Sequence, residues 1–204
     1  MTKATPGTKP STEASTPGVR RLEIVRAGAG VFLRYGYRKT SMGDVALAAK
    51  LSRQGLYLHF PNKDDLFREV IAHLGGLAVE ALKSELARPG LELEARLLAG
   101  FEAMAASALS GHEPAALREL FTSARELVAD ELERVDEQIV AELTNALTRA
   151  RKDRSRSAAG VSPRALAEHL YIATYGLQHR GHSGDDYRRR VATAIRIVCA
   201  SAGT

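Results

Sequence analysis

Two adjacent polar residues, Arg53 and Gln54, stand at the start of a short predicted helix and match the hydrogen-bonding edges of DNA bases. Arginine binds guanine, and glutamine binds adenine, through paired hydrogen bonds in the major groove. Ser52 precedes them as a candidate N-cap, while Leu56 and Phe60 follow at an i, i+4 spacing that places both on one buried face. We therefore expect the exposed residues at the start of this helix to read base edges.

A second short helix is predicted immediately upstream. Thr40 and Ser41 are candidate caps for a helix that buries Val45 and Ala49 on one face. The helical pattern breaks at residues 49–51 before the base-reading helix begins. Two short helices separated by such a break form a helix-turn-helix, and the apolar spacing of residues 20–35 predicts a third helix against which they pack.

The segment from Tyr35 to Phe67 resembles the DNA-binding domain of the TetR family of bacterial transcriptional regulators. Two motifs carry the resemblance, G-Y-x-x-T-S at residues 36–41 and L-Y-x-H-F-x-N-K-x-x-L at residues 56–66. It covers about the first third of the chain. The other matching positions are Arg21, Ile24, Ala27, Phe32, Asp44, Ala46, Ala49 and Ser52.

The resemblance implies that certain polar residues hold the DNA backbone. The matching positions here are Thr40, Ser41, Tyr57, His59 and Lys63. Thr40, Ser41 and Lys63 lie near helix N-termini, where exposed N–H groups and the helix dipole favour phosphate. Plain helix capping is the alternative role for the two hydroxyls, and the two roles are compatible.

Three positions depart from the family pattern. Lys50 stands in the turn where the family usually has glycine, which predicts a lysine in an unfavourable backbone region. Gly55 replaces a common Thr or Ser, and Leu58 replaces a common aromatic residue. Gly55 belongs, with Arg53 and Gln54, to the predicted DNA-binding surface, so both replacements alter that surface and no relative's operator sequence transfers to this chain.

The distribution of charge supports a DNA-binding N-terminal region. The 204 residues have a net charge of +5, yet residues 1–63 hold 11 Lys or Arg against 3 Asp or Glu. Residues 64–204 hold 18 against 21. A basic domain joined to a slightly acidic one is typical of a nucleic-acid-binding protein with a separate second domain.

Hydrophobic periodicity predicts an all-α fold of about nine helices. We expect a disordered arm over residues 1–18, a helix-turn-helix domain over 19–63, and a larger helical ligand-binding and dimerisation domain over 64–204. The predicted helices beyond the helix-turn-helix begin at Asn62 and then span residues 91–109, 113–121, 126–152, 162–178 and 185–200. A surface loop is predicted over residues 149–160.

The resemblance also implies a small-molecule pocket in the second domain, with ligand binding releasing the DNA. The candidates are large side chains on helices that should face one another, and ordinary core packing is the alternative role for each. The few charged residues on these faces favour an apolar or amphipathic ligand. The candidate pocket residues are Leu97, Phe101, Met104, Phe121, Tyr171 and Tyr175.

One helix-turn-helix contacts too few phosphates for specific binding at physiological salt, so a homodimer on an inverted repeat is expected. The last two helices, about residues 164–178 and 185–200, are the predicted dimerising pair, forming a four-helix bundle with their copies. Their predicted contact residues are Leu166, Leu170, Ala173, Ala194, Ile195 and Val198.

Other function classes lack support in the sequence. None of the six histidines has a partner at metal-ligand spacing on one helix, and no hydrolase, metalloprotease or nucleotide-binding motif occurs, so neither an enzyme nor a bound metal or cofactor is predicted. Cys199 on an apolar face is expected to be a small buried hydrophobe. No run approaches membrane-spanning length, and a cytoplasmic location is expected. Two alternatives remain, a non-specific architectural DNA binder and a helical interaction module without an operator.

Overall fold

A computed structural model describes residues 17–109, 112, 114–150, 160–179 and 184–202. The predicted arm before Pro17 and most of the predicted 149–160 loop lie outside the described residues. Within them the chain is helical, without strands, which confirms the all-α prediction. The helices are α1 (Pro17–Tyr35), α2 (Met42–Ala48), α3 (Arg53–Tyr57), α4 (Lys63–Leu86), α5 (Leu93–Leu109), α6 (Pro114–Leu127), α7 (Ala129–Ala150), α8 (Pro163–His179) and α9 (Gly184–Ala202).

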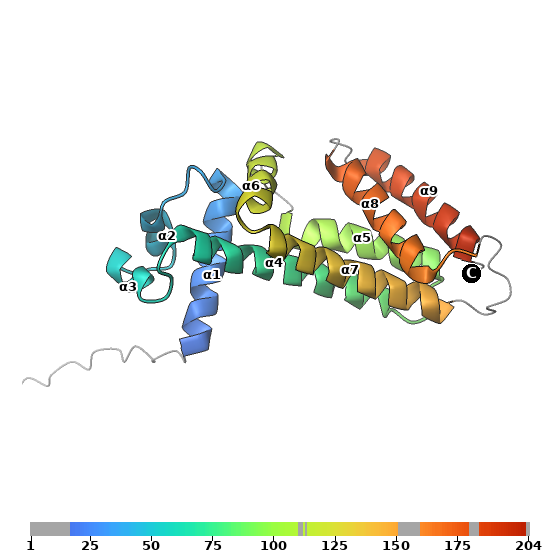
Figure 1. Ribbon diagram of the computed structural model, residues 1–204, viewed down its shortest axis with the longest axis horizontal. Coiled ribbons are helices and arrows are strands. Elements are labelled where there is room, and N and C mark those ends of the chain that lie inside the picture. The colour runs from blue at the N-terminus through green and yellow to red at the C-terminus, as the bar shows by residue number, and fades with distance from the viewer. Residues whose placement is uncertain (1–16, 110–111, 113, 151–159, 180–183, 203–204) are drawn as a thin grey trace, which may run out of the picture.

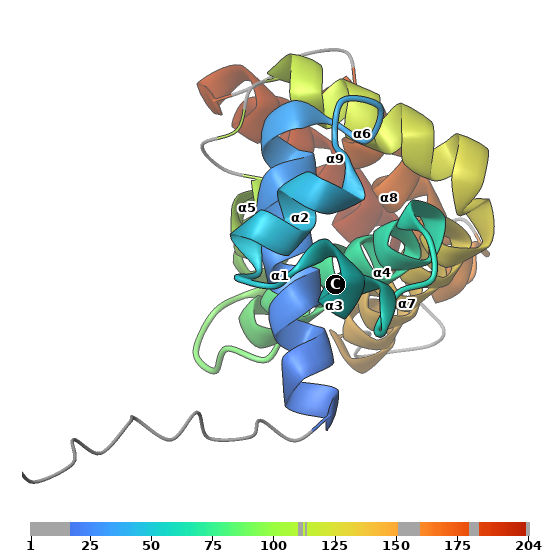
Figure 2. The same ribbon diagram turned by 90° about the vertical axis from the view of Figure 1, so that its left-hand side faces the viewer.

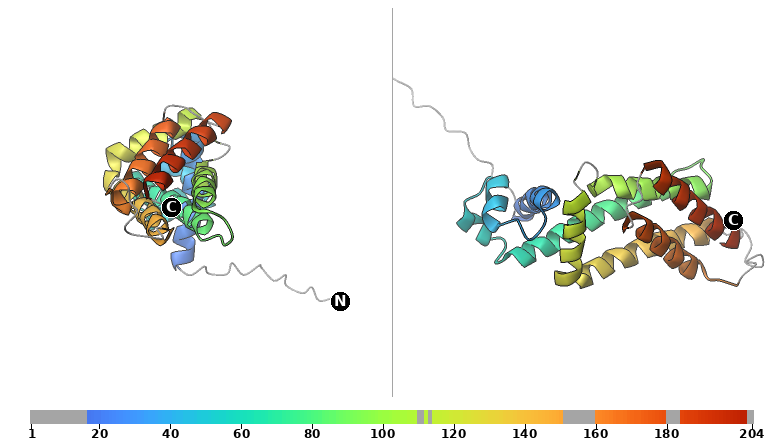
Figure 3. Two further views of the ribbon diagram at one scale, coloured as in Figure 1. Left: turned by 90° about the vertical axis from the view of Figure 1, so that its right-hand side faces the viewer. Right: turned by 90° about the horizontal axis from the view of Figure 1, so that it is seen from above.

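The molecule is elongated, with two parts joined by one long helix (Figure 1). We call α1–α3 the head and α5 with α7–α9 the body. Helix α4 starts in the head and runs the length of the body beside α5 and α7. Viewed from the head end, α2 and α3 lie in front of α1 and α4 (Figure 2). Helix α6 crosses between the head and the body, as the view from above shows (Figure 3).

The three helix starts predicted around the head are confirmed by their N-caps. The Ser41 hydroxyl accepts a hydrogen bond from the N–H of Asp44, whose carboxylate accepts from the N–H of Ser41 in return. The Ser52 hydroxyl accepts from Gly55 N–H at 3.0 Å. The side chain of Asn62 accepts from Asp65 N–H at 2.8 Å. These bonds satisfy N–H groups that have no partner within their own helices.

The turn between α2 and α3 places Lys50 in the left-handed region, at φ 54°. This is the unfavourable backbone conformation predicted from the replacement of glycine. It lets the chain reverse, so that Leu51 N–H donates to Ala46 O at 2.8 Å. The turn therefore keeps its geometry with a lysine in it.

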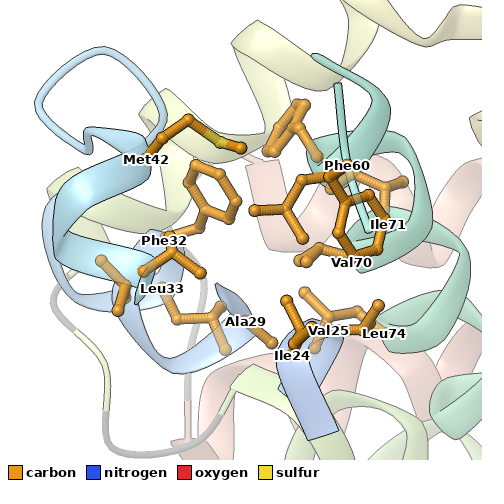
Figure 4. Close-up of a cluster of buried hydrophobic side chains, with 14 of the residues drawn as sticks. Ile24, Val25, Ala29, Phe32, Leu33, Met42, Phe60, Val70, Ile71 and Leu74 are labelled. Atoms are coloured by element: carbon orange, nitrogen blue, oxygen red, sulfur yellow. The ribbon is translucent and has the colours of Figure 1, made fainter. Parts of the chain in front are cut away.

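The core of the head includes side chains from outside the head (Figure 4). Phe32 of α1 and Phe67 of α4 meet edge to face, with ring centroids 5.1 Å apart, and both are fully buried. The α4 residues Val70, Ile71 and Leu74 continue this cluster. Helix α6 adds three buried side chains to it, from Leu120, Ala124 and Val128.

A second buried cluster fills the body, and it includes most of the residues predicted at the dimer interface. Leu166, Leu170, Ile195 and Val198 are all less than 9% exposed within one chain, and Ala194 packs against them. The predicted interface stripe is therefore wrong, because this apolar face of α8 and α9 packs on α5 and α7 of the same subunit. Of the six predicted dimer-contact residues, Ala173 lies on the exposed face.

Some helix boundaries also differ from prediction. Helix α1 begins at Pro17 rather than Arg20, since proline is well suited to a first helical turn. Helix α6 continues to Leu127 and α7 starts at Ala129, whereas the sequence predicted a break between residues 121 and 126. The break lies at Val128, which is buried in the head core and carries no glycine or proline signal nearby.

We expect Phe67→Ala to lower the free energy of unfolding by about 3–5 kcal/mol, because it removes a fully buried ring shared by α1 and α4. Leu47→Ala is the control, since Leu47 is 81% exposed and its loss should change stability by about 0.5 kcal/mol or less. Urea denaturation followed by circular dichroism measures both. Equal losses in the two variants would contradict this description of the core.

Candidate nucleic-acid interface and ligand pocket

The exposed face of α3 carries the predicted base-reading residues. Arg53 and Gln54 are exposed in the first turn of the helix, and Leu56 is fully buried beneath them. The Arg53 guanidinium lies 5.8 Å from the centre of the Tyr57 ring, which is 40% exposed. Leu58, at the C-cap, is 84% exposed. The short helix α3, whose buried residue is Leu56, thus presents the polar side chains of Arg53 and Gln54 to solvent.

Arg21 of α1 fixes the end of α3. Its guanidinium donates to the backbone carbonyl of His59 and to both carboxylate oxygens of Glu69 in α4. The same group lies over the Phe60 ring, 4.0 Å from its centre. Arg21 thereby joins α1, α4 and the segment after α3, a positioning role that the sequence did not reveal beyond its place in the family pattern.

The two hydroxyl residues predicted to bind phosphate, Thr40 and Ser41, differ in their exposure to solvent. Ser41 is exposed, and its bonds to Asp44 hold the pKa of that carboxyl below its usual range. Thr40 is only 3% exposed, and its hydroxyl donates to Gly36 O at 2.7 Å. A buried hydroxyl with this partner cannot meet a phosphate, so we correct the prediction for Thr40 and assign it to the structure of the turn.

Lys63, the first residue of α4, supports the same turn. Its ammonium group donates to the carbonyls of Tyr37 and Thr40, each at 3.0 Å, and lies 4.0 Å from the centre of the Tyr37 ring. Two of its three N–H bonds are thus used within the head, which leaves one for a phosphate. Lys63 is half-buried, as is His59.

A cavity of about 340 Å³ lies where α4, α5, α6, α7 and α8 meet. Met104, Phe121, Tyr171 and Tyr175 of the predicted set line its wall, and most of the remaining wall is aliphatic. Leu97 and Phe101 do not line it. Both are fully buried in the body core, because they face α4 and α9 one to two helical turns away, so their prediction as pocket residues is wrong.

Polar groups are confined to a small part of the cavity wall. The Tyr171 hydroxyl donates to the Asp136 carboxylate at 2.5 Å. Burial, together with that hydrogen bond, raises the pKa of Tyr171, so the phenol remains a protonated donor at neutral pH. The Arg125 guanidinium lies 5.2 Å from the centre of the Tyr175 ring, and Glu133 completes the charged set. The sequence did not predict that Arg125, Glu133 and Asp136 line the cavity, because their spacing does not distinguish a cavity wall from a solvated helix face.

The described residues hold no candidate metal site and no candidate membrane-spanning helix. No group of three or more His, Cys, Asp or Glu side chains there could hold a metal ion. No described helix combines the length and apolarity that crossing a bilayer requires. Cys199 is 1% exposed, as expected of a small buried hydrophobe.

Residues 24–70 match the sequence model for bacterial regulatory proteins of the tetR family. The chain is 40% identical over 52 residues to the uncharacterised HTH-type transcriptional regulator YfiR of Bacillus subtilis, covering 26% of this chain and 25% of that protein. It is 38% identical over 50 residues to a probable acrEF/envCD operon repressor of Escherichia coli K12, covering 24% and 23%. The chain thus spans about a quarter of the length of the curated relatives it matches.

The fold likeness extends over most of the chain. A crystal structure assigned to a TetR-family transcriptional regulator from Mesorhizobium loti superposes with a TM-score of 0.72, covering 91% of this chain and 98% of that one. The two sequences are 21% identical, so this comparison concerns the fold alone. The head is therefore similar to known relatives in sequence and fold, and the body in fold.

We expect Lys63→Met to lower the free energy of unfolding by about 1–3 kcal/mol, because two part-buried carbonyls lose a charged donor while the aliphatic stem is retained. Lys39→Met, at an exposed lysine next to the same turn, is the matched control and should leave stability nearly unchanged. Urea denaturation measures both variants. If Lys63→Met is as stable as the control, the carbonyl bonds do not hold the turn.

Proposed function

Because the chain belongs to the TetR family of bacterial regulatory proteins, we propose that it is a sequence-specific DNA-binding transcriptional regulator. We assign it as a repressor that leaves its operator when a small molecule occupies the cavity. The observation that carries the proposal is the exposed Arg53–Gln54 pair at the start of α3, at the far end of a basic head. The proposed regulatory function needs no catalytic group.

The proposed DNA surface divides into base-reading and backbone-binding parts. Arg53 and Gln54 read bases, and Gly55 between them and the buried Leu56 leaves room for the approach of the groove edge. The backbone-binding part comprises Ser41, Tyr57, His59 and the remaining N–H of Lys63. Backbone contacts set the register on the duplex, while base contacts supply specificity.

DNase footprinting on the DNA upstream of the protein's own gene tests this function. A regulator should protect one short site with two-fold sequence symmetry at nanomolar protein. Protection of every fragment alike would instead indicate the architectural role. No binding to any fragment, including a random-sequence selection, would leave the helical interaction module as the function.

Specific binding requires two heads, which the outer faces of α8 and α9 are suited to bring together. Ile172 on α8 and Ile197 on α9 are 67% and 63% exposed, and the small residue Ala173 lies beside Ile172. Burying these side chains against a second copy would remove a large apolar area from water. The proposed homodimer therefore uses this exposed face and not the inward stripe.

The cavity supports an amphipathic effector. Its volume of about 340 Å³ is at the small end of the usual range for ligand pockets. Apolar side chains such as Ile71, Leu74 and Ile139 suit an apolar body, while Arg125 and Asp136 at one part of the wall suit a polar group. The proposed effector is therefore a small amphipathic molecule.

Arg53→Ala or Gln54→Ala should weaken binding to the protected site by about 1–3 kcal/mol and leave binding to random DNA almost unchanged. The reason is that each side chain contributes base contacts rather than charge neutralisation. Lys39→Ala is the comparison, as an exposed cation outside α3 should affect both DNAs alike. Titration by fluorescence anisotropy at fixed salt measures the affinities. Parallel losses on both DNAs would remove Arg53 and Gln54 from base reading.

Ile172→Glu and Ile197→Glu should yield monomers, since each places like charges across a two-fold contact. Leu77→Glu is the control, because Leu77 is a 42% exposed apolar residue on α4, outside α8 and α9. Sedimentation velocity reports the mass, and circular dichroism checks that the helices persist. Dimers in both variants would place the subunit contact elsewhere.

A further inference from the structure

The turn between α1 and α2, residues 36–40, is held from two sides by opposite charges. Gly36 has φ +79°, and the hydroxyl and N–H of Thr40 close the turn onto the Gly36 and Tyr37 carbonyls at 2.7 and 3.2 Å. From the α4 side, Lys63 donates to the carbonyls of Tyr37 and Thr40. The carbonyl groups of Gly36, Tyr37 and Thr40 are therefore bound by the turn itself and by α4.

Two N–H groups of the same turn, those of Tyr37 and Arg38, are bound by a residue of α6. The carboxylate of Glu119, in α6, accepts from Tyr37 N–H at 2.6 Å through one oxygen and from Arg38 N–H at 2.9 Å through the other. The Ser123 hydroxyl, one turn along α6 and 2% exposed, donates to Glu119 Oε1 at 3.2 Å. A carboxylate with two backbone donors and a supporting hydroxyl is a preorganised, charge-assisted contact.

Gly36 is required at this contact for two reasons. Its positive φ disfavours any residue with a side chain. In addition, a Cβ at this position would collide with the Glu119 carboxylate. The glycine therefore allows both the reversal of the chain and the close approach of α6.

The residues adjoining Glu119 form part of the cavity wall. Leu120 and Phe121 follow it directly and line the cavity, as does Arg125. Leu120 is also a member of the head core, as are the α4 wall residues Ile71 and Leu74. A molecule entering the cavity must therefore contact side chains whose other neighbours belong to the head core. A shift of α6 would move the Glu119 backbone relative to the 36–40 turn and so strain the bonds that its carboxylate makes there.

We propose that Glu119 couples occupancy of the cavity to the conformation of the head, by releasing or straining the N–H groups of Tyr37 and Arg38 when α6 moves. The coupling of cavity to turn is independent of DNA, whereas its effect on operator affinity rests on the proposed function. The other ion pairs near this contact are more exposed or do not contact the 36–40 turn. The Arg38–Glu126 pair is 3.3 Å apart and more than half exposed on both sides, and the Arg68–Asp130 pair joins α4 to α7 without contacting the turn.

A cavity-filling variant tests the coupling without knowledge of the effector. Ala105 lines the cavity from α5, so Ala105→Trp fills it, and Ala105→Leu is a smaller replacement in case the tryptophan variant fails to fold. Ala95→Trp is the matched control, an exposed position on the same helix outside the cavity. Far-UV circular dichroism establishes that each variant is folded.

The first readout is amide hydrogen exchange, measured by NMR. Filling the cavity should speed exchange at Tyr37 and Arg38 roughly fivefold or more, while the Leu51 amide, bonded within the head to Ala46 O, should keep its rate. Ala95→Trp should change none of the three. Unchanged exchange at Tyr37 and Arg38 in a folded, cavity-filled variant would overturn the proposal. An equal rise at Leu51 would also overturn it, because the head would then be loosened as a whole.

The second readout is affinity for the footprinted site in a double-mutant cycle with Glu119→Gln, which keeps the shape of the side chain but offers one acceptor oxygen. Cavity filling should weaken operator binding roughly fivefold or more with Glu119 present and much less in the Glu119→Gln background. Equal weakening in both backgrounds would show that the signal bypasses Glu119. If no specific site exists, the proposed function fails, and the exchange rates still decide whether the cavity and the turn are coupled.

Discussion

The sharing of α4 between two hydrophobic cores constrains the rest of the structure. Its first half places Leu66, Phe67, Val70 and Leu74 in the head core, and its second half places Val79, Leu82 and Leu86 in the body core. A continuous helix of 24 residues transmits rotation along its length, because its internal hydrogen bonds resist bending. The head therefore cannot change its orientation without a change in how α4 packs against α5 and α7.

The 36–40 turn shows how this constraint extends to α6. A turn of five residues exposes both backbone donors and backbone acceptors, and buried groups of either kind need partners. Here the carbonyls of Tyr37 and Thr40 accept from a cation on α4, and the N–H groups of Tyr37 and Arg38 donate to an anion on α6. The turn consequently lies between two helices that both line the cavity. The hydrogen bonds of the turn depend on the relative position of those two helices. The conformation of the turn that leads into α2 is therefore sensitive to packing in the cavity.

The sequence predicted the features that depend on local chemistry. The caps at Ser41, Ser52 and Asn62, the strained Lys50 turn and the inward Leu56–Phe60 pair all follow from side chains a few residues apart. It could not predict which of two apolar faces of α8 and α9 is internal, because both faces carry leucine or isoleucine and the choice depends on α5 and α7. The same limit explains the error at Leu97 and Phe101, and the failure to find Glu119, whose partners lie about 80 residues away.

The geometry explains why small displacements of the helices around the cavity should have a large effect on DNA binding. Helix α4 is about 36 Å long at 1.5 Å per residue, so a tilt of about 5° at its body end moves its head end by about 3 Å. In a dimer joined through the exposed Ile172 and Ile197 faces, both heads would move, and the distance between the two α3 helices would change by up to about twice that amount. The proposed base-edge hydrogen bonds from Arg53 and Gln54 would not tolerate shifts of this size, because such bonds weaken steeply beyond about 3.2 Å. A ligand in a cavity of modest volume would therefore be sufficient to control the proposed DNA binding at the opposite end of the molecule.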